Sequence, residues 1–63
     1  MRYLLYEETI DEASGQSMER LYGIGTNSYV EARAMLDGMP RYQGIDCWDG
    51  KQWHYDVVAE VDA

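Results

Sequence analysis

The sequence predicts an α+β fold: a four-stranded antiparallel sheet with one α-helix packed on one face, in the order strand, strand, helix, strand, strand. Three observations predict it. Two segments rich in aromatic and aliphatic residues open the chain, a capped amphipathic helix occupies its middle, and alternating apolar residues follow. One helix laid on one sheet face buries both sets of apolar residues together. The 63 residues form a single domain, residues 1–63.

The first two strands are expected at residues 2–7 (RYLLYE) and 18–24 (MERLYGI). In the second strand, alternation places Arg20, Tyr22 and Ile24 on one face. The polar stretch between the strands, residues 8–17, contains a glycine and is expected to be a loop. Four acids gather around its start, namely Glu7, Glu8, Asp11 and Glu12.

The helix is expected over residues 29–37. Ser28 and Glu31 match a capping box, in which each side chain satisfies a free backbone N–H of the first turn. Gly38 is the expected left-handed terminator, and Pro40 prevents continuation. The apolar stripe that faces the sheet consists of Ala32, Met35, Leu36 and Met39.

The last third of the chain is expected to be a hairpin whose odd-numbered apolar residues share the buried face. A two-residue Asp49-Gly50 loop would put the two apolar sets on opposite sides of the sheet. A three-residue loop, 48–50, with Gly50 in a left-handed bulge, instead pairs Cys47 with Lys51 and Ile45 with Trp53. We therefore expect the three-residue loop.

This register assigns the remaining hairpin residues to faces. Asp46 and Asp56 should point to a polar outer face, and Trp48 should be exposed in the loop. Cys47 and His54 should lie on opposite faces, so neither a metal site nor a Cys–His nucleophile is expected.

Charge narrows the class of partner. Twelve acidic residues against five basic ones give a net charge of −7, which disfavours direct nucleic-acid binding and membrane surfaces. A protein with a basic surface is the complementary partner, although solubility alone explains the charge equally well. The single cysteine cannot form an internal disulfide, and neither a signal peptide nor a membrane span is evident, so a cytoplasmic location is expected.

Catalysis is not expected, and neither is a cofactor. The acids lack the spacing of a calcium-binding EF-hand loop. The GIGTNS segment, residues 23–28, is placed as an anion-binding turn would be, but it lacks the spacing of a P-loop and is expected to be a turn with a helix cap.

The aromatic residues favour an interface. Six Tyr, two Trp and no Phe mean that every ring carries a polar atom, as is common where one side of a residue is packed and the other is wet. The expected partner-binding residues combine exposed acids and rings: Glu7, Glu8, Asp11, Glu12, Tyr42, Asp46, Trp48, Asp49 and Asp56.

In size, charge and layout around SYVEARAMLDGMP and IDCWDGKQWHYDV, the chain resembles the small acidic inhibitors that phages and mobile elements encode against host defence, anti-CRISPR proteins among them. The resemblance implies a non-catalytic inhibitor that occupies a basic, nucleic-acid-binding site on a host defence protein such as a CRISPR-Cas complex. Two alternatives remain: a small-ligand or nucleotide-sequestering protein that uses the GIGTNS turn, and a structural module that assembles as a homodimer or larger homo-oligomer.

Overall fold

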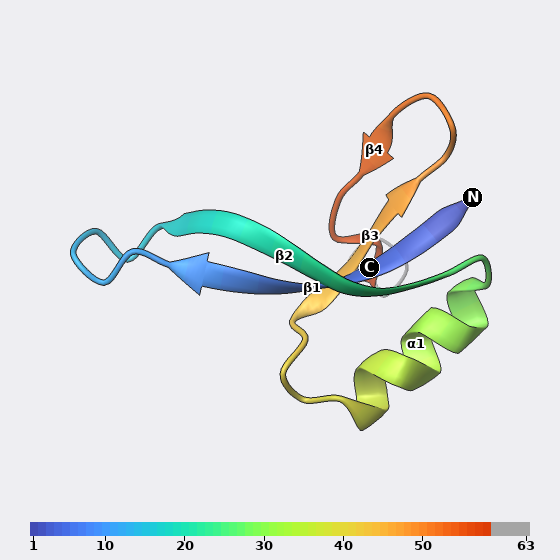
Figure 1. Cartoon of the computed structure of the whole chain (residues 1–63), viewed down its shortest axis with the longest axis horizontal. Helices are drawn as coiled ribbons and strands as arrows, with labels where there is room; N and C mark the ends of the chain where they lie inside the picture. Colours follow the sequence, from blue (N-terminus) through green and yellow to red (C-terminus); the bar gives the residue numbers. More distant parts are fainter. Residues whose placement is uncertain (59–63) are drawn as a thin grey trace.

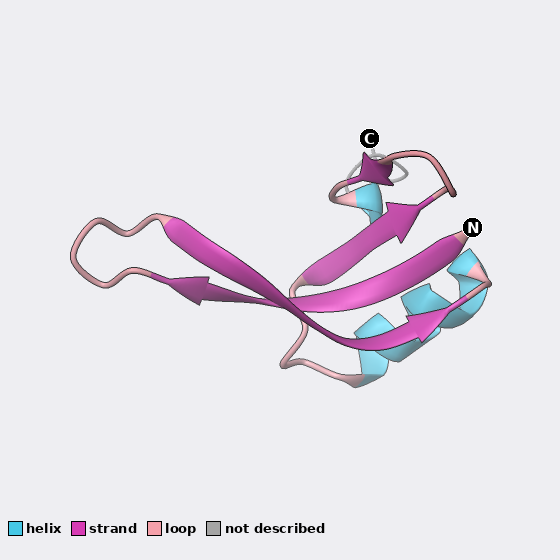
Figure 2. Ribbon diagram, turned by 45° about the horizontal axis from the view of Figure 1, so that its top comes forward, coloured by secondary structure: helices cyan, strands magenta, loops and turns pink. Residues whose placement is uncertain are grey.

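The computed structural model describes residues 1–58, with Ser17 and Met18 described by their backbone alone. Its elements are β1 (Arg2–Ile10), β2 (Ser17–Thr26), α1 (Tyr29–Gly38), β3 (Gly44–Trp48) and β4 (Trp53–His54). The strands form one antiparallel sheet in the order β2-β1-β3-β4, and α1 crosses one of its faces (Figure 1 and Figure 2). The predicted α+β class, with four antiparallel strands and one helix, is confirmed.

The β1–β2 hairpin is longer than the sequence predicts. Its strands reach Ile10 and begin again at Ser17, so the loop shrinks to residues 11–16. Two backbone hydrogen bonds close this loop, from Asp11 N to Gln16 O at 2.9 Å and from Gly15 N to Asp11 O at 2.7 Å. The far half of the hairpin extends beyond the part of the sheet that α1 covers (Figure 1).

A β-bulge in this hairpin overturns the predicted alternation of β2. Leu5 pairs with Ile24, but Tyr6 pairs with Tyr22, so Gly23 is an extra residue on β2. The bulge leaves Ile24 beside Leu5 on the helix-facing side and turns Tyr22 and Arg20 to the other side, which we call the outer face. The three side chains therefore do not share one face.

The N-terminus of α1 lies where the capping box predicts, with one difference. Ser28 accepts a hydrogen bond from the Glu31 N–H at 3.3 Å, as expected. The Glu31 carboxylate, however, accepts from the Thr26 hydroxyl at 2.6 Å, and that hydroxyl accepts from the Ser28 N–H at 3.3 Å. The Thr26 hydroxyl thus links the Glu31 carboxylate to the Ser28 N–H, which the carboxylate itself would bind in a capping box.

The helix C-terminus differs from the prediction. Gly38 is the last helical residue and does not have a left-handed backbone conformation, and the cap residue is Met39. The Met39 N–H donates to the carbonyl of Leu36 at 3.3 Å, which closes the final turn without a left-handed residue.

A small core fills the space between α1 and the sheet. Its buried members are Leu5, Ala32, Tyr42 and Ile45. Partly buried side chains surround them: Tyr3, Ile24, Tyr29, Met35, Leu36 and Val58. Tyr42 was expected at a partner surface, but it packs in this core, with its hydroxyl directly over Gly23.

The predicted register of the β3–β4 hairpin is wrong. Cys47 pairs with His54 and Trp48 pairs with Trp53, so four residues, 49–52, connect the strands. The Asp49 carboxylate sets this turn, because Oδ1 accepts from the N–H groups of Lys51 at 2.7 Å and Gln52 at 2.9 Å. Gly50 does have the expected left-handed conformation, with φ of 100°.

The parity argument failed because β4 is only two residues long. Asp56 has a φ of 55°, which ends the extended backbone, and Val57 and Val58 begin a helical turn. The odd-numbered residues therefore do not share a strand face: Val57 is buried, whereas Trp53 and Tyr55 are exposed. The last odd-numbered apolar residues of the predicted face, Ala59 and Val61, lie outside the described residues.

Candidate functional site on the outer face of the sheet

Arg20 organises the outer face of the sheet. Its guanidinium contacts three carboxylates, at 2.5 Å from Asp46, 3.2 Å from Glu8 and 3.3 Å from Asp56. The same group lies 4.1 Å above the ring centroid of Tyr6 and 5.5 Å from that of Tyr55. A planar guanidinium suits both kinds of contact, because it donates at its edge and stacks through its face.

Asp46 is the buried centre of this cluster, which contradicts its predicted exposure. None of its surface is accessible. Its oxygens accept from Arg20, from the Tyr22 hydroxyl at 2.6 Å and from the Asp56 N–H at 3.0 Å. Because a buried charge is tolerated only when it is paired and hydrogen-bonded, Asp46 holds three separate segments together and is not available to a partner.

Asp56 does lie on the outer face, half exposed. Its carboxylate accepts from the Tyr6 hydroxyl at 2.6 Å, and this hydrogen bond, with the charge of Arg20, lowers the pKa of Asp56. Burial, and then the hydrogen bonds to Asp56 and Asp46, raises the pKa of Tyr6 and of Tyr22 respectively. At neutral pH the phenols stay protonated and the carboxylate stays charged, so the cluster acts as a fixed set of ion pairs.

An aromatic patch adjoins the Arg20 cluster; it consists of Tyr22, Trp48, Trp53 and Tyr55. The Trp53 ring stacks on Tyr22 at a centroid distance of 5.5 Å and on Tyr55 at 6.2 Å. Trp48 meets Trp53 at 5.5 Å with a tilt of 53°. All four side chains are substantially exposed, and Trp48, at 37%, bears out its predicted exposure although it ends β3 instead of lying in a loop.

A pocket of about 310 Å³ opens beside the patch. Arg2 and Leu4 of β1 line one side, and Trp48 and Trp53 line the other. The pocket arises from strand pairing, since Arg2 is the cross-strand neighbour of Trp48, which in turn pairs with Trp53. Among the described residues, its lining is largely apolar and contains one cationic side chain, Arg2.

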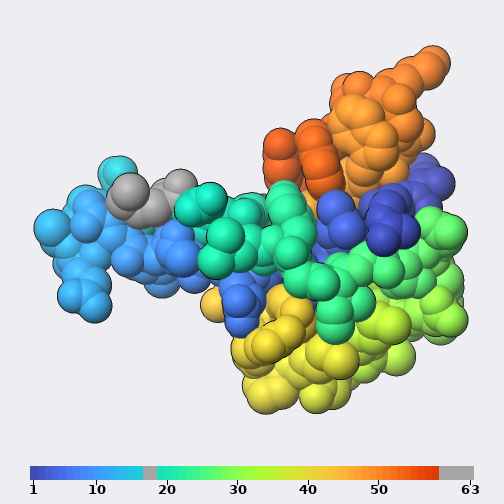
Figure 3. All heavy atoms as spheres, in the orientation of Figure 1, coloured from blue at the N-terminus to red at the C-terminus, as the bar shows by residue number. Residues whose placement is uncertain are grey.

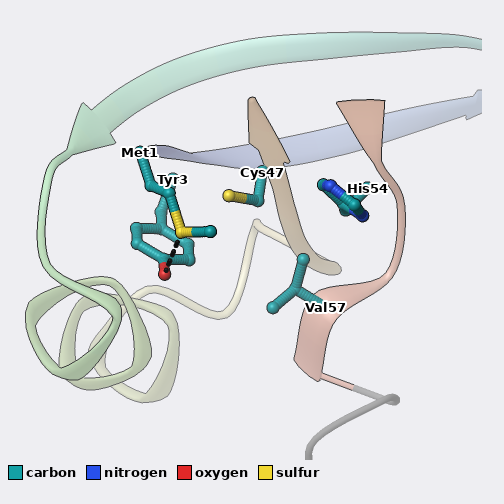
Figure 4. Close-up of a pocket in the computed structure, with 5 residues that line it drawn as sticks. All are labelled: Met1, Tyr3, Cys47, His54 and Val57. Carbon is teal, nitrogen blue, oxygen red and sulfur yellow. Dashed lines mark hydrogen bonds between the residues drawn. The ribbon is translucent and has the colours of Figure 1, made fainter. Parts of the chain in front are cut away.

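A second pocket, on the helix-facing side, brings together Cys47 and His54, which were expected on opposite faces (Figure 4). The observed register makes them cross-strand neighbours. His54 Nε2 lies 2.7 Å from Asp49 Oδ2, and Met1, Tyr3 and Val57 complete the lining. Burial raises the pKa of the Cys47 thiol, so the thiolate needed of a nucleophile or metal ligand is disfavoured. Within residues 1–58, no group of three potential metal ligands is found.

The four acids near the first loop do not form one cluster. Glu7 and Glu8 are adjacent on β1 and point to opposite faces, with Glu7 3.8 Å from Arg41 and Glu8 paired with Arg20. Asp11 is used locally, where it accepts from Ala13 N at 3.2 Å and from the Ser14 hydroxyl at 2.8 Å. Glu12 is exposed at the loop.

Asp49 also has an intramolecular role. The Gln52 N–H, together with His54 and the Lys51 N–H, lowers the pKa of Asp49 to about 2. Its carboxylate is therefore charged at neutral pH but engaged in its own turn, which reduces its capacity to bind a partner.

The GIGTNS segment does not form an open anion site. Gly23 and Gly25 provide room for packed side chains, since a Cβ at Gly25 would lie 2.5 Å from Leu4 Cδ2. The Glu31 carboxylate, through its bond to Thr26, occupies the start of the helix with a negative charge. The geometry disfavours phosphate binding there.

Sequence reasoning missed the role of Arg20 and the joint placement of Tyr22, Trp53 and Tyr55. One signal was available: a glycine within a strand, such as Gly23, often marks a bulge, and this bulge directs Arg20 and Tyr22 outward.

Comparison of the chain with protein-family models, curated proteins and solved structures gave no match. Among residues 1–58, none of the helices combines the length and apolarity needed to cross a membrane.

Proposed function

We propose that the protein is a non-catalytic inhibitor that binds a basic surface of another protein through its projecting β1–β2 hairpin. One observation carries the proposal. The hairpin presents the exposed residues Glu12 and Glu19, and neither carboxylate has an ion-pair partner among the described residues, whereas Glu7 and Glu8 are paired with arginines. Unpaired carboxylates on a projecting element keep their charge available to a partner.

Exposed apolar side chains on the same hairpin support a contact surface. Ile10 is 61% exposed and Leu21 is 46% exposed. Apolar contacts at the centre and charges at the rim are the usual arrangement of a protein interface. The space-filling view shows the hairpin extending away from the rest of the molecule, so that it could enter a groove (Figure 3).

The absence of catalysis is part of this proposal. The conspicuous charged groups of the outer face are engaged with one another: Arg20 is paired with three carboxylates, and the tyrosines beside it stay protonated. A general acid or base works best when its pKa is near the working pH. The pKa values of Tyr6 and Tyr22 are raised and that of Asp56 is lowered, so all three lie further from neutrality than in a free side chain.

In its specific form, the proposal places the hairpin in a site that normally holds nucleic acid, on a host defence protein such as a CRISPR-Cas complex. The carboxylates of Glu12 and Glu19 would then take the place of phosphates. The net charge of −7 supports such a target, because a nucleic-acid-binding site is rich in Lys and Arg.

The test is capture of binding proteins from a host lysate by the wild-type chain and by two matched variants. Glu12→Lys and Asp37→Lys both change the net charge from −7 to −5, since each replaces one negative charge by one positive charge. Asp37 lies on α1 with its side chain 71% exposed, away from the hairpin. We expect a basic protein to be retained by the wild type and by Asp37→Lys, and lost by Glu12→Lys.

Two results would contradict the proposal. Recovery of nothing but further copies of the chain at low salt would favour the homo-oligomeric module instead. Equal recovery of the partner by both variants would show that the hairpin carboxylates do not recognise it.

A further inference from the structure

The pocket between Arg2, Leu4, Trp48 and Trp53 is independent of the proposed hairpin interface. It lies on the outer face where β1 begins and β3 meets β4, whereas the hairpin loop is at the opposite end of β1 (Figure 1). At about 310 Å³ it is at the lower end of the range for small-molecule sites, about 300–1,000 Å³. A ligand with one compact ring system matches this volume.

The pocket wall is suited to a flat ring. Two of the residues that line it, among those the structure describes, are tryptophans, with ring centroids 5.5 Å apart and planes inclined by 53°. Trp53 is held in place by its stack on Tyr22, and Leu4 supplies an aliphatic surface. Aromatic rings gain from contact with indole faces and edges in this range of distances.

The charge of the pocket comes from Arg2. Arg20, Arg33 and Arg41 each have a carboxylate within 4.0 Å, but Arg2 has no ion-pair partner among the described residues. Gly25 leaves room for the Arg2 side chain, because a Cβ at that position would lie 2.9 Å from Arg2 Nη2. A cation that stays unpaired in a protein of net charge −7 is complementary to an anionic group of a ligand.

We propose that this pocket binds a small aromatic carboxylate, with the ring against Trp48 and Trp53 and the carboxylate on the Arg2 guanidinium. A single negative charge matches the single cation, while a more highly charged ligand would be repelled by the acidic excess of the chain. We take the ligand to be a free small molecule, because a pocket of about 310 Å³ lies within the size range of small-molecule sites.

The experiment is an NMR titration with naphthoate and with its neutral analogue naphthamide. The chain has only two tryptophans, both in the pocket, so their indole N–H signals report directly on occupancy. We expect both signals to shift, with naphthoate binding more tightly than naphthamide. Arg2→Gln should weaken naphthoate binding about three- to fivefold, as for an exposed ion pair, and leave naphthamide unchanged.

Controls separate the site from a general charge effect. Arg41→Gln removes the same charge from a side chain outside the pocket and should leave both affinities unchanged. Trp48→Leu should weaken the binding of both ligands, and a cooperative unfolding transition of this variant would show that the chain still folds.

Unshifted indole signals, equal binding of the two ligands, or equal effects of Arg2→Gln and Arg41→Gln would overturn the proposal. Tighter binding of naphthyl phosphate than of naphthoate would overturn the assignment of a single charge.

Discussion

At the scale of single residues, Asp46 shows how burial changes the meaning of an acidic side chain. Counted in the sequence, it is one of twelve acids that could face a partner. In the fold it joins β3 to Arg20 and Tyr22 of β2 and to the backbone of Asp56. Desolvation of such a pair offsets much of its attraction, but removal of one partner leaves the other charge without compensation.

We therefore predict that Asp46→Ala strongly destabilises the protein, by about 2–4 kcal/mol in the free energy of unfolding. Urea unfolding followed by circular dichroism measures this. Asp37→Ala, which removes an exposed acid 3.9 Å from Arg33, should change the free energy by less than about 0.5 kcal/mol. Comparable effects of the two substitutions would show that the Arg20 cluster does not hold the sheet together.

The tyrosines of the same cluster predict a loss of stability in alkali. Burial raises the pKa of Tyr6 and Tyr22 in the folded protein, and the hydrogen bonds to Asp56 and Asp46 raise it further. In the unfolded chain these phenols ionise near pH 10. Above that pH the unfolded chain binds fewer protons than the folded one, so the free energy of unfolding should fall as the pH rises.

Urea unfolding at a series of pH values around 10 checks this prediction. Tyr22→Phe removes one of the two phenols, so its alkaline decline should be shallower than that of the wild type. An identical pH dependence in the two proteins would mean that Tyr22 does not keep its proton in the folded state.

At the scale of elements, the sequence predicted features that depend on neighbouring residues, but not features that depend on contacts between distant segments. The start of α1 was predicted from Ser28 and Glu31, because a cap depends on residues within one turn. The β3–β4 register was not, because β4 stops short of Asp56, whose position depends on contacts with Arg20 and Tyr6 of the first hairpin. Tyr42 could not be placed either, because its hydroxyl packs over Gly23, which lies on β2, two elements earlier.

Close packing of the sheet gives a prediction at Gly44, the first residue of β3. A Cβ there would lie 2.6 Å from the Tyr6 hydroxyl and 2.9 Å from its ring. Tyr6 is buried and bound to Asp56, so it cannot easily move. Gly44→Ala should cost about 1–3 kcal/mol, the usual range for overpacking.

Thermal unfolding checks the Gly44 prediction, with Gly38→Ala as the control. Gly38 ends α1, has no atom within 4 Å of a built Cβ and lacks the left-handed conformation that would disfavour alanine. Its substitution should leave the midpoint unchanged or raise it. A Gly44→Ala protein as stable as the wild type would show that Tyr6 is free to shift.

At the scale of the whole molecule, the fold separates engaged acids from available ones. A basic partner stays a prediction from the composition, whereas the structure shows that Asp46, Asp49 and Glu8 serve the fold while Glu12 and Glu19 project on the hairpin. The small core of Leu5, Ala32, Tyr42 and Ile45 leaves little margin, so variants that test binding must be chosen among exposed residues.

The central claim is that the hairpin carboxylates recognise a basic protein, and its most direct test is the affinity of the captured partner for single charge reversals at low and high salt. Each charge reversal raises the net charge by two, so Glu12→Lys, Glu19→Lys and Asp37→Lys all have a net charge of −5 instead of −7. Glu12→Lys and Glu19→Lys should each weaken binding about tenfold at low salt relative to Asp37→Lys. The difference should shrink at high salt, where exposed charges are screened. Equal affinities of the three variants at low salt would contradict the claim.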